Sequence, residues 1–349
     1  MLVSASGRQP ITHVFVAILL FSACAKKAAP DDKPPDKAGP TAPASTAPAP
    51  PKSAPVPAKP APRNTLAKRC VLGGDPLPAD CVGGGEGLAF GKDGLLYVVD
   101  GKHVRRYQRA AGDACSFEPS GEPIELPPDN VRPQPLDKGP VYMRSGGAAW
   151  HLVRGGDAVY AHDFLGGLFR IDRGKPEPAC VDVFGYNSVA AVGKKLLANR
   201  TGIVELRLGK QCSAVPAKID DKARGDLYAA HGKLYLASGS ELTRYDGATP
   251  TKLGEGTRIC YVTGLTSCGD GACLVDSNCM QMVQLAADGK VLRVLDDDKL
   301  FATRPWSIAE ATTSDAGDVY VLARHRDKTN DKEICEAAIY EVPAAAFAL

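Results

Sequence analysis

The stretch EGLAFGKDGLLYVVDGKHVRRYQ, from Glu86 to Gln108, decides the fold. It contains three short apolar segments, EGLAF, LLYVVD and HVRRYQ, separated by turns that carry Gly, Asp or Lys. Apolar and polar side chains interchange along these segments, as in Val104-Arg105-Arg106-Tyr107, which is typical of half-buried antiparallel strands. The stretch therefore predicts a run of short β-hairpins.

The same pattern occurs six times along the chain. The copies begin with EGLAF, GGAAW, NSVAA, DLYAA, TGLTS and WSIAE, at Glu86, Gly146, Asn187, Asp226, Thr263 and Trp306. The starts are 60, 41, 39, 37 and 43 residues apart, and four short strands in about 40–45 residues is the spacing of a propeller blade. The sequence predicts an all-β, six-bladed β-propeller over residues 65–349, with TLAKRCVL (Thr65 to Leu72) closing the ring as the outer strand of the last blade.

A short apolar segment lies near the N-terminus. Residues 14–21 read VFVAILLF, which is too short to span a bilayer, since that takes about 20 residues. It is typical of the core of a signal peptide, here residues 1–23, with an uncleaved hydrophobic anchor as the alternative. The motif FSAC, which ends at Cys24, resembles a bacterial lipobox. That resemblance implies lipidation of Cys24 and a membrane anchor.

Residues 24–64 differ in composition from the rest of the chain. Twelve of the 28 prolines lie between residues 25 and 63, with almost no large apolar side chain among them. Such a segment cannot bury a core, so we expect a flexible, disordered linker that holds the propeller away from the membrane. A Pro-rich motif bound by a partner is the alternative. Ala25 follows the cysteine where an inner-membrane retention signal has Asp, which favours the outer membrane of the bacterial cell envelope, on its periplasmic side or its surface.

Charge excludes one class of partner. The net charge is +2, and the residues after 62 hold 35 basic and 37 acidic side chains. A nearly neutral body lacks the basic surface that a polyphosphate backbone requires, so we expect no nucleic acid as a partner.

The cysteine count fits an exported protein. Of eleven cysteines, a lipidated Cys24 leaves ten for disulfides, as expected in an oxidising compartment. Cys70 and Cys81 bracket a short loop that they are expected to close, and Cys268 and Cys273 flank one tight turn. Pairing among the remaining six stays open: Cys115, Cys180, Cys212, Cys260, Cys279 and Cys335. A zinc site is the alternative around residues 260–279, although the spacings do not match paired Cys-x2-Cys hooks.

Candidate metal ligands follow from the repeat. The innermost strand of each blade starts beside the central channel, so the starts of the six copies form one mouth. Glu86, Asn187 and Asp226 bring carboxylate and amide oxygens to it, the donors that Ca²⁺ or another hard divalent cation takes. The alternative is that Asn187 and Asp226 only cap turns through bonds to the backbone.

Two family resemblances bear on this mouth. The pattern G-x-LYV-x-D followed by h-x-R-h resembles NHL-type propellers, and Gly85 to Asp100 is similar to the first blade of the gluconolactonase/SMP-30 family. The second resemblance implies that Glu86 matches the metal-binding Glu of that family and Asn187 the Asn of its PND loop. Thr263 stands where a later blade should open with Asp, and Asp226 is the nearest carboxylate.

Two insertions interrupt the repeat. Phe117–Pro140 and Arg324–Ala337 are expected to be long loops on the face that carries Glu86 and Asn187, where loops on a rigid scaffold often serve function. The first hypothesis is a non-enzymatic binding or scaffold module for an envelope protein or a small-molecule ligand. The alternative is a lactonase-like hydrolase whose divalent metal polarises a carbonyl and activates water. No catalytic residue is assigned.

Overall fold

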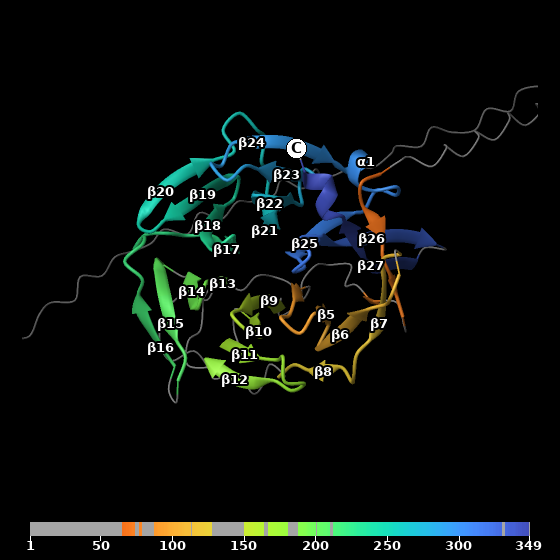
Figure 1. The fold of residues 1–349 in the computed structure, drawn as a ribbon, viewed down its shortest axis with the longest axis horizontal. Coiled ribbons are helices and arrows are strands. Elements are labelled where there is room, and N and C mark those ends of the chain that lie inside the picture. Colours follow the sequence, from red (N-terminus) through yellow and green to blue (C-terminus); the bar gives the residue numbers. More distant parts are fainter. Residues whose placement is uncertain are drawn as a thin grey trace, which may run out of the picture. The chain divides into compact units, whose positions relative to one another are not determined.

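Six largely antiparallel sheets surround a common axis (Figure 1). They are seen in a computed structural model that describes residues 65–73, 77–78, 87–112, 114–127, 150–163, 167–180, 188–199, 201–209, 212–329 and 332–348. These ranges lie within one compact unit, 60–349. The predicted six-bladed β-propeller is therefore confirmed. No helix in these ranges is long and apolar enough to cross a membrane.

Five blades are built from consecutive strands, numbered outward from the axis, and the sixth combines the last three strands with β1. Blade one contains β4 (Leu88–Phe90), β5 (Leu96–Asp100), β6 (His103–Arg109) and β7 (Ser116–Pro119). Blade two contains β9 (Trp150–Gly155), β10 (Ala158–Asp163), β11 (Gly167–Arg170) and β12 (Glu177–Cys180). Blade three contains β13 (Ser188–Val192), β14 (Lys195–Asn199), β15 (Ile203–Arg207) and β16 (Ser213–Pro216). Blade four contains β17 (Asp226–Ala230), β18 (Lys233–Ser238), β19 (Glu241–Asp246) and β20 (Thr249–Leu253). Blade five contains β21 (Val262–Cys268), β22 (Gly271–Asp276), β23 (Gln281–Leu285) and β24 (Val291–Asp296). The sixth contains β25 (Ser307–Thr313), β26 (Val319–Thr329), β27 (Lys332–Val342) and β1 (Lys68–Arg69).

Tight turns hold the hairpins together. Between β5 and β6, Asp100 pairs with His103 across a turn whose Gly101 has φ +58°, a left-handed conformation that costs glycine little. The turn residues identified in the sequence thus place the strand ends as predicted.

The hydrophobic core lies between blades, and each interface buries its own cluster. In the cluster between blades one and two, Tyr97 and Val99 pack with Trp150 and Val159. The other five clusters likewise join neighbouring blades, including the sixth with the first. Because strands alternate their two faces between two neighbouring blades, the apolar runs such as LYVVD are buried on both sides.

The two ends of the propeller meet in blade six. Lys68 pairs with Glu341 and Arg69 with Tyr340, so β1 is the outer strand of the last blade, as predicted. The chain then crosses to blade one, where β2 (Val71–Leu72) pairs in parallel with β7. The segment Thr65–Leu72 therefore forms two short strands that join two blades, where one strand was expected.

A polar cluster strengthens the same junction. Arg109 of blade one donates to the Glu341 carboxylate of blade six, N–O 2.5 Å, and Tyr320 donates to that carboxylate at 2.8 Å. Glu341 is 3% exposed, and the ring of Tyr320 packs on those of Phe90 and Phe117. An ion pair thus lies within an apolar contact between the first and last blades.

The two insertions are not simple loops. β26 and β27 are eleven residues each and pair along their whole length as a long hairpin, so the expected loop at Arg324–Ala337 is wrong. The other insertion begins as β7 and continues as β8 (Ile124–Glu125), both paired with β6, and its remainder from residue 128 lies outside the described residues. Short helical segments at Asp297–Leu300 (α1) and Ala344–Phe347 complete the described part.

Candidate functional site in the central channel

The six expected mouth positions are only partly visible. Glu86, Gly146 and Asn187 lie outside the described residues, so two of the three predicted oxygen donors remain predictions. Asp226 is the first residue of β17 and is half-buried. Thr263 donates its hydroxyl to the carbonyl of Ile308 at 3.0 Å, which joins blades five and six. Trp306 is 42% exposed just before β25.

A carboxylate that the sequence analysis did not single out lies in the channel. Glu310 is in β25, the innermost strand of blade six, and its side chain is only 12% exposed. A β-bulge between Ile308 and Glu310 shifts the pairing of β25 with β26, so Ile308 and Ala311 both pack in the cluster between blades five and six. Bulges of this kind re-aim a side chain.

Glycine in the next blade leaves room for this carboxylate. A Cβ on Gly264 would come 2.8 Å from the backbone N of Ala311 and 3.1 Å from Oε1 of Glu310. Burial raises the pKa of Glu310 above its ordinary value, and the Asp226 carboxylate adds to this rise while His151 opposes it. The His151 ring of blade two and the Asp226 carboxylate of blade four thus act in opposite directions on the pKa of Glu310 in blade six.

Two histidines of blade two complete the site. Nδ1 of His151, in β9, lies 3.7 Å from Oε2 of Glu310, so the two side chains face each other from blades separated by blade one. His162 of β10 is paired directly with His151 and is 3% exposed. Burial, with a further contribution from His151, lowers the pKa of His162 to about 3, so it is neutral near pH 7. Its Nδ1 has no hydrogen-bond partner in the described ranges.

The inner strands also enclose a hollow along the axis. A cavity of about 300 Å³ is lined by residues from all six inner strands, among them Ala89, Val153, Ala190, Ala229 and Thr266, and it reaches Glu310. The wall also includes polar residues, among them Arg154, His231, Ser267 and Thr312, and Glu310 contributes a carboxylate to this set. The arrangement can receive a small polar ligand or an ion.

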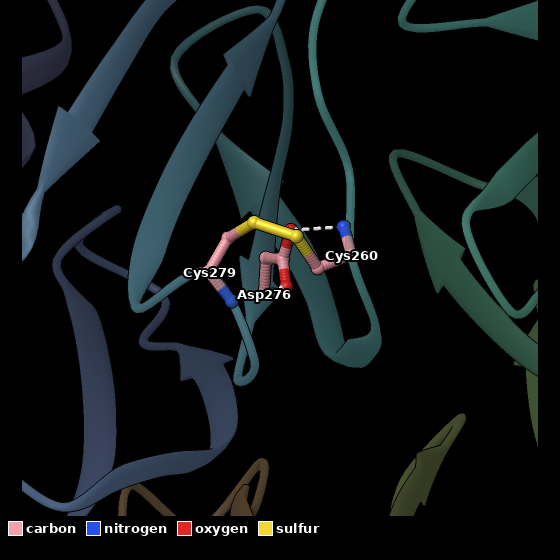
Figure 2. A group of neighbouring side chains, drawn as sticks. All are labelled: Cys260, Asp276 and Cys279. Atoms are coloured by element: carbon pink, nitrogen blue, oxygen red, sulfur yellow. Dashed lines mark hydrogen bonds between the residues drawn. A yellow bond between two sulfur atoms is a disulfide. The ribbon is translucent and has the colours of Figure 1, made fainter.

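A second cluster proves to be structural. Sγ of Cys260, Sγ of Cys279 and a carboxylate oxygen of Asp276 gather within 4.8 Å, the grouping that a zinc ion would need. The two sulfurs form a disulfide, as Figure 2 shows. The Asp276 carboxylate accepts N–H groups from Cys260 (2.6 Å), Tyr261 (2.9 Å) and Cys279 (3.1 Å), and a fourth from the Gln281 amide (3.1 Å). Because zinc takes thiolates, the alternative of a zinc site there is contradicted.

The disulfides partly match expectation. Cys268–Cys273 is confirmed, and Cys180–Cys212 and Cys260–Cys279 resolve pairings that the sequence left open. The expected closure of a loop by Cys70 and Cys81 is wrong, because Cys70 pairs with Cys115. Cys70 lies between β1 and β2, so its bond secures the ring and not a local loop. Cys335 is also disulfide-bonded, while Cys81 and Cys24 lie outside the described residues.

Fold and site together define a six-bladed β-propeller with a partly charged channel. No family model matches the chain, and no curated protein matches it. Solved structures resemble it in fold alone. They include virginiamycin B lyase from Staphylococcus aureus, with 11% identity, TM-score 0.44 and coverage of 73% of this chain and 83% of that one.

Two further similar structures come from different proteins. The PQQ-bound aldose sugar dehydrogenase from Streptomyces coelicolor has 13% identity and TM-score 0.43, with 78% of this chain and 98% of that chain covered. BamB from Moraxella catarrhalis has 11% identity and TM-score 0.38, with 73% and 81% covered. At such low identity these likenesses carry no conclusion about activity. The gluconolactonase/SMP-30 resemblance stays a prediction.

Proposed function

We propose that this chain is an envelope lipoprotein whose propeller binds a protein or ligand on the face where the inner strands begin. The observation that carries the proposal is the β26–β27 hairpin. Its strands have eleven residues each, whereas the longest of the other described strands have seven. Ser307 pairs with Arg324 at the start of β25, so the part of the hairpin beyond Arg324 extends past the blade on that face.

Several contacts hold the base of the β26–β27 hairpin in place. His325 Nε2 and the Tyr340 hydroxyl lie 2.8 Å apart across its base, and Arg69 forms an ion pair with Glu336. The short strand β3 (Leu77–Pro78) pairs with β27 at Ala337 and Glu336. A partner that contacts the base of the hairpin would therefore meet residues already held by these contacts, and would lose less conformational entropy on binding than a mobile loop imposes.

An exposed aromatic side chain marks the base of the hairpin. Trp306 is 42% exposed, and its backbone N–H donates to the carbonyl of Arg324 at 2.6 Å. Tryptophan is enriched among residues that dominate binding energy at interfaces. The hairpin and Trp306 together form the surface that we assign to a partner.

Partner capture from envelope extract tests this assignment. Replacing residues 327–334 with Asn-Gly keeps the hairpin closed by a two-residue turn and removes only its projecting end. We expect this variant and Trp306→Ala to lose a partner that the unchanged chain recovers. Leu292→Ala is the matched control, since Leu292 is 39% exposed on the outer strand β24. Equal recovery by all four proteins would contradict the proposal.

The membrane anchor is a separate part of the proposal. Lipidation of Cys24 and sorting to the outer membrane rest on the FSAC motif and on Ala25. Changing Cys24→Ala should move the protein from the membrane pellet to the soluble envelope fraction. A variant that sediments like the unchanged chain would remove the anchor from the proposal.

A second candidate function is hydrolysis of a lactone or small ester. Asp226, at the start of an inner strand, and its effect on Glu310 favour it, because acidic groups at a channel mouth attract divalent metal. Glu86, Asn187 and Asp226 would hold Ca²⁺ or a similar ion. Calorimetry with millimolar Ca²⁺ and turnover of a lactone test this function, and absence of both heat and turnover would exclude it.

A further inference from the structure

The gap between Glu310 and His151 has the size of a shared metal ion. At 3.7 Å, Oε2 and Nδ1 are beyond hydrogen-bond distance, although they are close enough for an ion pair when His151 is protonated. An ion about 2.1 Å from each atom would make an angle of roughly 120° between them, near the tetrahedral value that zinc prefers. We propose that Glu310 and His151 bind a divalent transition-metal ion such as Zn²⁺ inside the channel, with water completing its coordination.

The protein holds the carboxylate in place for this role. The bulge in β25 turns Glu310 away from the apolar interface that Ile308 and Ala311 fill. Gly264 keeps the space beside Oε1 free of a side chain, since a Cβ there would lie 3.1 Å away. Burying a carboxylate is costly without a compensating charge, and a divalent ion supplies two. Asp226 adds further negative charge to the same region.

A buried imidazole on the same face supports a nitrogen-ligated ion. His162 is the direct cross-strand partner of His151, so the two side chains lie on one face of blade two. It is 3% exposed, and its Nδ1 has no partner among the described residues. It therefore offers a nitrogen donor directly behind His151, either to the ion through water or to the ring of His151.

The donor set also selects the kind of metal. Imidazole nitrogen with carboxylate suits Zn²⁺ and neighbouring transition metals, whereas Ca²⁺ and Mg²⁺ take oxygen donors. This separates the site from the oxygen-only set of Glu86, Asn187 and Asp226. The cavity of about 300 Å³ that reaches Glu310 gives a hydrated ion a route along the channel.

Zinc calorimetry on the purified full chain, kept free of reductant, tests the site. The unchanged chain should bind one equivalent of Zn²⁺. Glu310→Gln and His151→Asn each remove a direct ligand, so each should weaken binding by at least the roughly 10- to 100-fold that loss of an outer-shell partner costs. His103→Asn, at an exposed histidine of β6, is the matched control and should bind like the unchanged chain. Equal affinity in all four proteins would mean surface binding only and would overturn the proposal, as would absence of heat at millimolar Zn²⁺.

A measurement on the unchanged chain covers the case in which the two variants do not fold. Zn²⁺ should slow modification of His151 by diethyl pyrocarbonate, read by peptide mass spectrometry, and leave the rate at His103 unchanged. Equal rates at His151 with and without Zn²⁺ would overturn the site. Neither readout depends on partner capture or on lactone turnover, so the zinc site and the proposed function are tested independently of each other.

Discussion

Asp276 shows how a residue that resembles a metal ligand can instead organise a turn. Its side chain is fully buried and accepts three backbone N–H groups and one side-chain amide. The same place at the end of a second strand holds Asp100, Asp163 and Asn199, all buried. Asn199 likewise donates to the carbonyl of Gly225, just before the next blade begins. The polar residue that ends these strands in the repeat is thus a structural anchor.

We expect Asp276→Ala to be strongly destabilising. The change leaves three backbone donors without an acceptor in a buried place, and each such group costs about 1–3 kcal/mol, so the loss should be on the order of 3–5 kcal/mol. Urea unfolding followed by circular dichroism measures it. Asp270→Ala, at an exposed turn of the same blade, should change stability by less than about 0.5 kcal/mol. Similar losses for the two variants would show that the hydrogen bonds of Asp276 matter little.

His162 makes a pH-dependent contribution that can be isolated. Burial lowers its folded-state pKa to about 3, against about 6.5 in an unfolded chain. Between these values the unfolded chain binds a proton that the folded protein does not, so stability is lost as pH falls from 6.5 toward 3. At about 1.4 kcal/mol per pKa unit, the loss should reach a few kcal/mol.

Replacing His162 with Leu should therefore flatten the dependence of stability on pH over this range. Urea midpoints measured at pH 7.5 and pH 4.5 give the comparison. His103→Leu alters no buried group and should retain the slope of the unchanged chain. If His162→Leu loses as much stability on acidification as the unchanged chain, another group causes the loss. Glu310 acts in the opposite sense, because its raised pKa favours the folded state as pH falls through the range above 4.5.

Among the secondary-structure elements, the β26–β27 hairpin of blade six differs most from the prediction made from the sequence. Its end, HRDKTNDKEIC, is rich in charge and has no apolar alternation, so the sequence reads as a loop. The structure pairs it strand to strand from His325–Glu336 out to Thr329–Lys332. Pairing there continues a ladder that begins in the buried part of the blade, an influence that local composition does not reveal.

The cysteine at the base of this hairpin leads to a third prediction. Cys335 is disulfide-bonded, and its neighbour Glu336 pairs with Pro78, three residues before Cys81. With Cys70 joined to Cys115, we expect Cys81 to be the partner of Cys335. Non-reducing peptide mapping should recover that crosslink, and denaturing alkylation of the lipidated protein should find no free thiol. Recovery of Cys70–Cys81, or labelling of Cys335 without reductant, would contradict this pairing.

Strands and their repeat were predictable, whereas the channel site was not. Alternation and turn residues determine a blade locally, so five of the six inner strands begin within two residues of the starts identified in the sequence, whereas β9 begins at Trp150, the last residue of GGAAW. Glu310 was not identified from the sequence because the bulge at Ile308–Glu310 shifts its register relative to the equivalent residues of other copies. Its only signal was a charged side chain within an innermost strand. His151 gave none, since its meeting with Glu310 depends on the ring as a whole.

For the whole molecule, closure of the ring is the feature that stability should depend on. Cys70–Cys115 joins residues 45 apart across the junction of blades six and one, while Cys268–Cys273 joins residues five apart within one hairpin. A crosslink that closes a longer loop removes more entropy from the unfolded chain, here by about 2 kcal/mol. Replacing the first pair with Ala should therefore cost about 2 kcal/mol more than replacing the second. Equal urea midpoints for the two double variants would contradict this account.

The position of β1 also determines when the ring can close during translation. Lys68 is synthesised long before its strand partners Glu341 and Tyr340. The interval from 68 to 342 is 274 residues, which at about 5–20 residues per second takes roughly 15–55 seconds. Throughout that time β1 has an unpaired edge, which can pair with a strand other than its native partner. A nascent chain of this kind therefore remains an open arc until blade six has been made, and any factor that protects it must act on the nascent chain.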